Sequence, residues 1–183
     1  DHGMMDVGLS GLRLLTQILD AGNAITAFSL LLYALTFNLR ERAARTFALL
    51  MGCLALVFSG DVMASLSLGS PERAVWLRMV WVGISLLPST YLHLSDALLA
   101  ATGRPSRGKR HLVIRLSYLV SGVFILAVGF SGLIVGPPED VGVTSYLSAG
   151  PFLPVYLLLV LALLAMTTYN LVRAYRRCLT RAS

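Results

Sequence analysis

The sequence predicts an all-α, polytopic integral membrane helix bundle that crosses the bilayer five times. Hydrophobic residues make up 56% of the 183 residues, and charged residues make up only 13%, about half the share usual in a soluble domain. The apolar residues gather in five stretches, and each holds about the 20 residues that a helix needs to span a bilayer core. Positive charge alternates between the segments that join these stretches.

Twelve of the fifteen Lys and Arg residues fall in three segments that alternate with segments poor in positive charge. They are Arg40, Arg42 and Arg45; Arg104, Arg107, Lys109, Arg110 and Arg115; and Arg173, Arg176, Arg177 and Arg181. Short loops rich in Lys and Arg stay in the cytoplasm. We therefore expect the N-terminus outside and the C-terminus in the cytoplasm. Because the basic residues flank spans, we expect them to meet lipid headgroups and not nucleic acid.

We expect one transmembrane domain over residues 1–183, because no repeat or linker divides the chain. Its helices are predicted at residues 9–37, 44–68, 74–102, 112–135 and 152–175. Each span should be helical, since lipid offers no partner to a free backbone group.

The connections carry turn chemistry. Ser70 is predicted to cap the third helix, with Pro71 in its first turn. The sequence Gly136-Pro137-Pro138 should end the fourth helix, and residues 141–147 fit either a short strand or an interfacial turn. Gly150-Pro151 then opens the fifth helix.

Ionisable side chains inside the spans are the first candidates for function, because charge is costly in hydrocarbon. Asp20 and Asn23 lie in the outer half of the first helix. Asp61 and Arg78 lie at similar depth on the second and third helices, and we predict that they pair. The pair would either fix these two helices or respond to a stimulus. Alternatively, Arg78 snorkels to the outer headgroups.

A second polar cluster follows Pro88, which should kink the third helix by removing one backbone hydrogen bond. His93 and Asp96 are three residues apart and share a helix face. One interpretation is a proton-responsive element, because His titrates near neutral pH. The other is that both groups hydrogen-bond to neighbouring helices, with Asp96 meeting Arg45 or Arg104.

Small residues on the fourth helix suggest close helix packing at Gly122, Gly129 and Gly132. Such residues let two backbones approach closely, within the chain or against another chain. We therefore expect membrane lipids and other membrane helices as partners, in a homodimer or a larger complex.

The sequence shows no catalytic constellation: it has no phosphate-binding Gly-rich loop, nucleophile elbow or HExxH motif. His93 lacks a second intramembrane His for haem, because His2 lies in the tail and His111 in a loop, and a zinc site needs more ligands. We expect no enzyme activity, no cofactor and no metal. Cys53 and Cys178 should lie at different levels and not bridge, and Cys178 is either a free thiol or palmitoylated.

Several motifs point to a known family. They are Asn38 followed by Ala44-Arg45-Thr46-Phe47; Trp76-Leu77-Arg78, Val82-Gly83-Ile84, Leu87-Pro88 and Thr102-Gly103-Arg104; and Gly150-Pro151-Phe152 with Tyr156. Over about residues 20–183 the chain resembles the seven-helix membrane region found N-terminal to bacterial sensor histidine kinases. The family has seven helices and a cytoplasmic output domain. This chain, with five, is either a fragment or a reused stand-alone subunit.

The resemblance implies a membrane-embedded sensory region of a two-component signalling protein, multi-pass in the bacterial inner membrane and non-catalytic in itself. The alternative is an accessory or scaffold subunit of a larger membrane complex, such as an energy-converting assembly. A transporter is the weakest interpretation, because five helices without a repeat suit alternating access poorly.

Overall fold

The computed structural model describes residues 2–37, 39–67, 69–103, 108–141 and 144–182. These form the helices α1 (His2–Phe37), α2 (Arg42–Leu66), α3 (Ser70–Ala101), α4 (Lys109–Phe130) and α5 (Leu153–Ala182). Each helix contains a segment long and apolar enough to cross a membrane. The predicted all-α bundle with five spans is therefore confirmed for the described part of the chain.

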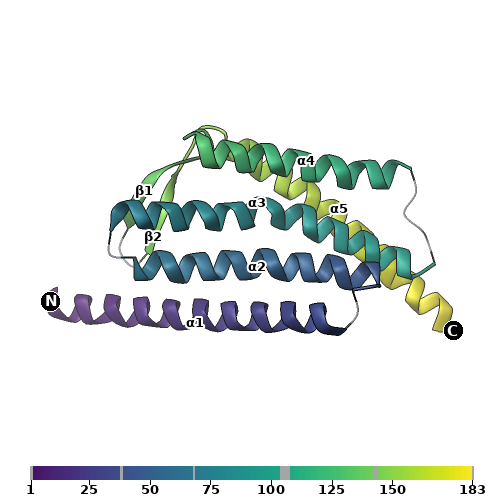
Figure 1. The fold of residues 1–183 in the computed structure, drawn as a ribbon, viewed down its shortest axis with the longest axis horizontal. Helices are drawn as coiled ribbons and strands as arrows, with labels where there is room; N and C mark the ends of the chain where they lie inside the picture. Colours follow the sequence, from purple (N-terminus) through teal and green to yellow (C-terminus); the bar gives the residue numbers. More distant parts are fainter. Residues whose placement is uncertain (1, 38, 68, 104–107, 142–143, 183) are drawn as a thin grey trace.

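The helix α3 is the centre of the bundle. It packs against α2, α4 and α5, whereas α1 packs along α2. Figure 1 shows α1 to α4 side by side in chain order, with α5 crossing behind them. Because α3 touches three other helices, its polar side chains can reach all of them.

A β-hairpin of β1 (Val135–Val141) and β2 (Thr144–Ala149) joins α4 to α5. The sequence predicted that the fourth helix extends to residue 135 and that residues 141–147 form at most one strand. The predicted end of the fourth helix was therefore wrong. The helix stops at Phe130, and Ser131 is already extended and bonds back to the Ala127 carbonyl. Apolar residues 133–135 continue the hydropathy of the helix, but they belong to the hairpin.

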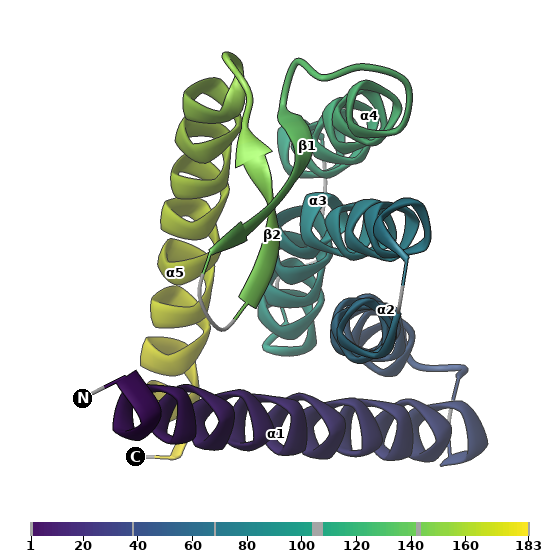
Figure 2. The ribbon, with the colours of Figure 1, turned by 90° about the vertical axis from the view of Figure 1, so that its left-hand side faces the viewer.

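The hairpin covers one end of the bundle, where α2 ends and α3 begins (Figure 2). Its Ile134, Val135 and Leu147 side chains are buried in one apolar cluster with Ala64 of α2 and Leu77 of α3. Pairing is irregular between Val135 and Pro138, as expected where proline has no N–H to donate.

The predicted cap of α3 is off by one residue, and the helix begins at Ser70, four residues before the predicted start at residue 74. Gly69 is the capping residue and makes no side-chain cap, while Ser70 is the first helical residue. Pro71 lies in the first turn as predicted, where its missing N–H has no intrahelical partner to lose.

Close helix packing occurs at Gly60 and Gly83, which face each other's helices across the α2–α3 contact. A Cβ on Gly83 would come within 3.0 Å of the Cys53 carbonyl oxygen. The glycines predicted for this role, Gly122, Gly129 and Gly132, have open space where a Cβ would stand. They therefore give no sign of close packing at these positions, and Gly132 lies beyond the end of α4 at Phe130.

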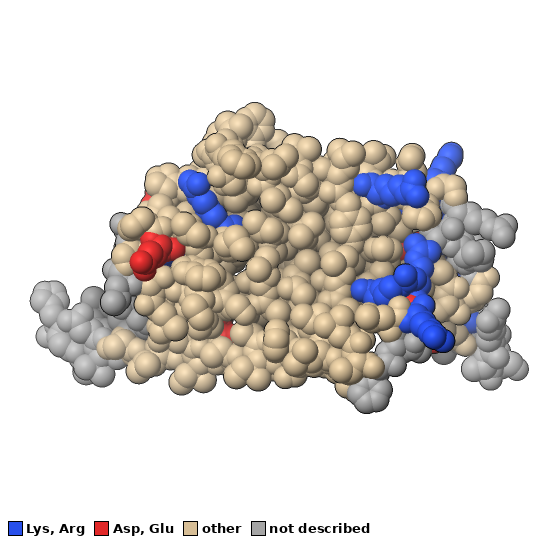
Figure 3. Space-filling model, in the orientation of Figure 1, with Lys and Arg blue, Asp and Glu red and all other residues tan. Residues whose placement is uncertain are grey.

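The described residues of the three basic segments lie at the end of the bundle opposite the hairpin. There α2 begins, α3 ends, α4 begins and α5 ends (Figure 1). In Figure 3 the Lys and Arg side chains on the visible face gather mainly at this end. We call it the basic end.

Candidate functional site

A buried carboxylate at the basic end joins three helices. Asp96 of α3 is 1% exposed, and its Oδ2 atom lies 3.4 Å from Nη2 of Arg42, the first residue of α2. Its other carboxylate oxygen pairs with Arg110, in the first turn of α4. Since both arginines come from helix starts, Asp96 fixes where α2 and α4 begin relative to α3.

The two arginines remain partly open to their surroundings, with side chains 35% and 29% exposed. They can therefore reach headgroups or water while they neutralise Asp96. Such a pair contributes more to a defined helix arrangement than to net stability, because desolvation offsets much of the attraction.

The partners of Asp96 differ from those expected. Contact with neighbouring helices was one of the two interpretations, but the arginines named there were Arg45 and Arg104. Arg42 lies one helical turn before Thr46, which is buried and hydrogen-bonds to the Arg42 carbonyl, whereas Arg45 is exposed. Helical phase thus selects Arg42, and Arg104 lies outside the described residues.

His93 contacts a different residue of α4 from the one that Asp96 contacts. Its Nδ1 atom lies 3.2 Å from the hydroxyl of Tyr118 on α4, and the two rings meet edge to face. One turn away, the hydroxyls of Ser89 and Ser121 lie 2.9 Å apart. These contacts form a short polar seam between α3 and α4.

The helix α5 joins the same network. The Asn170 side-chain amide donates to the Ser95 hydroxyl over 3.2 Å, directly beside Asp96 in the α3 sequence. Polar groups in the last two turns of α3 therefore contact α2, α4 and α5 together.

The second polar contact of α5 satisfies a backbone carbonyl of α3 that has no helical donor. Pro88 has no N–H, so the carbonyl of Ile84, four residues earlier, lacks its usual helical donor. The hydroxyl of Tyr156 on α5 donates to that carbonyl over 2.9 Å. Tyr156 is 3% exposed, and its ring packs edge-on against Trp81 and Phe124.

The helix α3 changes direction near its middle in Figure 1, in the part of the helix that contains Pro88. The carbonyl that is left free at the predicted kink therefore has a partner, because Tyr156 of α5 replaces the donor that Pro88 removes. In a membrane this matters more than in water, because lipid leaves the freed carbonyl unsatisfied.

The predicted Asp61–Arg78 pair is wrong. Arg78 donates to the Gly129 carbonyl of α4 over 3.3 Å and makes no ion pair with Asp61. Gly60 packs against Trp76 and Val80, which defines the α3 face toward α2. Arg78 lies two residues from each of these, on the opposite side of the helix. The sequence therefore predicted that Asp61 and Arg78 lie at similar depth, but it did not predict which face of α3 carries Arg78.

The remaining intramembrane candidates lie toward the hairpin end. Asp20 of α1 is half-buried and interacts electrostatically with Asp61 of α2, while Asn23 is exposed. Neither belongs to the Asp96 network.

Metal ligation has little support within the described ranges, where no three His, Cys, Asp or Glu residues gather. Cys53 is buried and Cys178 is exposed, and both are free thiols, so the prediction that they do not bridge is confirmed.

Sequence reasoning missed Arg42, Arg110, Tyr156 and Asn170 as members of the site. One signal was available: a proline inside a membrane helix frees a carbonyl, and a tyrosine in another apolar span is a natural donor for it. The arginines were visible only as part of the basic segments.

Comparison with known families gives one match. A family model described as the N-terminal 7TM region of histidine kinase matches residues 23–181, which covers the second part of α1, α2 to α4, the hairpin and nearly all of α5. The search of curated proteins and the search of solved structures gave no match. The resemblance inferred from the motifs is confirmed.

We predict that the Tyr156 hydroxyl and Pro88 are coupled. Tyr156→Phe keeps the ring and leaves the Ile84 carbonyl without its donor, so it should lower the free energy of unfolding by about 1–2 kcal/mol. In a Pro88→Ala background the restored N–H satisfies that carbonyl, and the same change should cost much less. Reversible unfolding in mixed micelles measures both, and equal costs in the two backgrounds would reject the coupling.

Proposed function

The chain belongs to the family of N-terminal seven-transmembrane regions of histidine kinases, and we propose that it acts as the non-catalytic receptor part of such a kinase. The family supplies the coarse function, a membrane-embedded sensory region. The finer proposal concerns how a stimulus would pass from one end of this bundle to the other.

The observation that carries the proposal is the Asp96 network. The start of α3 packs on the hairpin through Leu77, and its far end holds Asp96 between Arg42 and Arg110. One helix therefore connects the hairpin end to the starts of α2 and α4. A displacement at the hairpin would reach the basic end through α3.

The helix α3 contacts α5 at two levels. Tyr156 bonds to the Ile84 carbonyl near the bend, and Asn170 bonds to Ser95 near the basic end. A stimulus controls the output only if it binds two arrangements of these helices with different affinity. The bend at Pro88 and the Asp96 network are the element we propose to have two arrangements, in place of the Asp61–Arg78 pair.

We propose that the basic end faces the bacterial cytoplasm and that α1 begins on the outer side. The support is that the described residues of the three basic segments lie at that one end and that the Lys and Arg side chains on the visible face gather mainly there (Figure 3), as the positive-inside rule describes for inner-membrane proteins. On this basis the hairpin faces outside, where an extracytoplasmic stimulus arrives.

The orientation can be tested with a natural probe, because Cys178 is exposed at the basic end and Cys53 is buried. A membrane-impermeant maleimide should label the protein in inverted inner-membrane vesicles and not in intact spheroplasts. The Cys178→Ser variant should abolish this labelling. Labelling of Cys178 in intact spheroplasts would place the basic end outside and contradict the proposal.

The signalling role is tested by Asp96→Asn in the full-length gene product that carries this region. Removing the carboxylate charge releases both arginines, so the balance between the two arrangements should move. We expect basal autophosphorylation in membrane vesicles to change by about fivefold or more, since coupling between sites is typically about 1–3 kcal/mol.

The matched control is Glu41→Gln, which removes an exposed carboxylate beside Arg42 at the same end. It should leave autophosphorylation at the wild-type level. Equal activities of the wild type and both variants at equal protein amounts would contradict the role of Asp96. A gene product without kinase activity of its own would instead favour an accessory subunit.

A further inference from the structure

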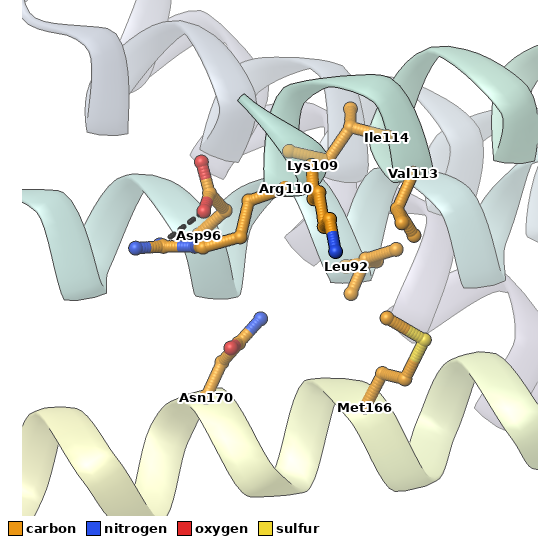
Figure 4. Close-up of a pocket in the computed structure, with 8 residues that line it drawn as sticks. All are labelled: Leu92, Asp96, Lys109, Arg110, Val113, Ile114, Met166 and Asn170. Carbon is orange, nitrogen blue, oxygen red and sulfur yellow. Dashed lines mark hydrogen bonds and ion pairs between the residues drawn. The ribbon is translucent and has the colours of Figure 1, made fainter. Parts of the chain in front are cut away.

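A pocket of about 120 Å³ lies between α3, α4 and α5 at the basic end. This is well above the share of about 30 Å³ that one water occupies in the liquid. Its wall is largely apolar and is formed by Leu92, Val113, Ile114 and Met166. Figure 4 shows these side chains around a hollow whose other edge is polar.

The polar edge carries unbalanced positive charge. Lys109 and Arg110 of α4 line it with Asp96 and Asn170. In Figure 4 the Lys109 amino group and the Asn170 amide approach the pocket from α4 and α5. Within the described ranges Lys109 has no hydrogen bond or ion pair. Arg110 pairs with Asp96 through its Nη2 atom, and its Nε atom is fully buried, so it does not face the open part of the pocket.

The positive and negative charges at this edge of the pocket do not balance. One carboxylate, Asp96, faces three cations: Arg42, Arg110 and Lys109. The excess is positive, and Lys109 is the pocket-lining cation that makes no pair among the described residues. An anion with several acceptor oxygens, such as a phosphate group, complements this edge.

The depth of the pocket identifies the rest of the ligand. The candidate spans of α3 and α4 end at Ala101 and begin at Lys109, so the polar edge lies at the membrane interface. The apolar wall includes Val113 and Met166, which lie deeper in the spans of α4 and α5. A free anion would leave this wall empty, whereas a lipid fills both parts.

We propose that this pocket binds an anionic phospholipid, with its headgroup phosphate at Lys109 and an acyl chain along Leu92, Val113, Ile114 and Met166. The bound lipid would sit against Asp96, where α2, α3 and α4 meet. This inference does not depend on the signalling role, because it rests on the charge and shape of the pocket.

The test is lipid retention by the purified full-length protein in neutral detergent, measured by native mass spectrometry. Three probes are offered separately: phosphatidylglycerol, phosphatidylcholine of the same chain length, and inorganic phosphate. Lys109→Gln removes the unpaired charge, and Met166→Trp fills the apolar part without changing charge. Arg115→Gln is the matched control, because Arg115 is exposed on the same helix and does not line the pocket.

We expect the wild type to retain phosphatidylglycerol in preference to phosphatidylcholine. Lys109→Gln should lower this retention by about fivefold, the value of about 1 kcal/mol for a basic residue near an anionic lipid surface. Met166→Trp should lower it as well, and Arg115→Gln should leave it unchanged.

Three results would overturn the proposal. Equal losses in Lys109→Gln and Arg115→Gln would show general surface attraction. Equal retention of the two lipids would show that the pocket does not distinguish lipids by the charge of their headgroup. Retention of inorganic phosphate that depends on Lys109, without such dependence for phosphatidylglycerol, would show a free-phosphate site.

Discussion

The buried carboxylate of Asp96 is the charge on which the arrangement of the basic end depends. Hydrocarbon provides no partner for such a group, so Arg42 and Arg110 must stand where their guanidinium groups can reach it. Because these arginines open α2 and α4, a single side chain sets the positions of two helix starts. The same constraint explains the Tyr156–Ile84 contact, where a hydroxyl replaces the donor that Pro88 lacks.

These contacts give α3 a distinct role within a sensory region of the histidine kinase family. Its first half packs by shape, with Gly83 close to the α2 backbone and Leu77 in the cluster under the hairpin. Its second half packs through Leu92, which is clustered with Ile114 and Leu163, and through polar contacts to α2, α4 and α5. Hydrogen bonds and ion pairs tend to be either made or broken. We propose that a bent helix whose second half holds these polar contacts adopts two discrete arrangements.

Hydropathy and charge predicted the parts of the fold that depend on composition. Five spans and their approximate limits follow from the requirement for about 20 apolar residues, and they are present in the structure. The end of α4 was missed because residues 133–135 are as apolar as a helix end, although tertiary packing places Ile134 and Val135 in the cluster under the hairpin. Motifs of the family, such as Leu87-Pro88 and Tyr156, were recognised before their contact was known.

Helix faces were harder to predict than helix depth. Asp61 and Arg78 have similar depth, yet Arg78 donates to the Gly129 carbonyl of α4 and does not pair with Asp61. Asp96 was expected to meet an arginine, but the choice of Arg42 over Arg45 depends on how α2 is rotated. Rotation is set by side-chain packing across the whole α2–α3 contact, and a single sequence does not contain that information in any local motif.

The coupling between Asp96 and Arg110 is the most direct measure of this account. Unfolding free energies of the wild type, Asp96→Asn, Arg110→Gln and the double variant in mixed micelles give the interaction free energy of the pair. We predict that each single variant is destabilised and that the double variant costs at least about 1 kcal/mol less than the sum. Additive costs would mean that the carboxylate does not hold α4 in place, and the account of the basic end would be wrong.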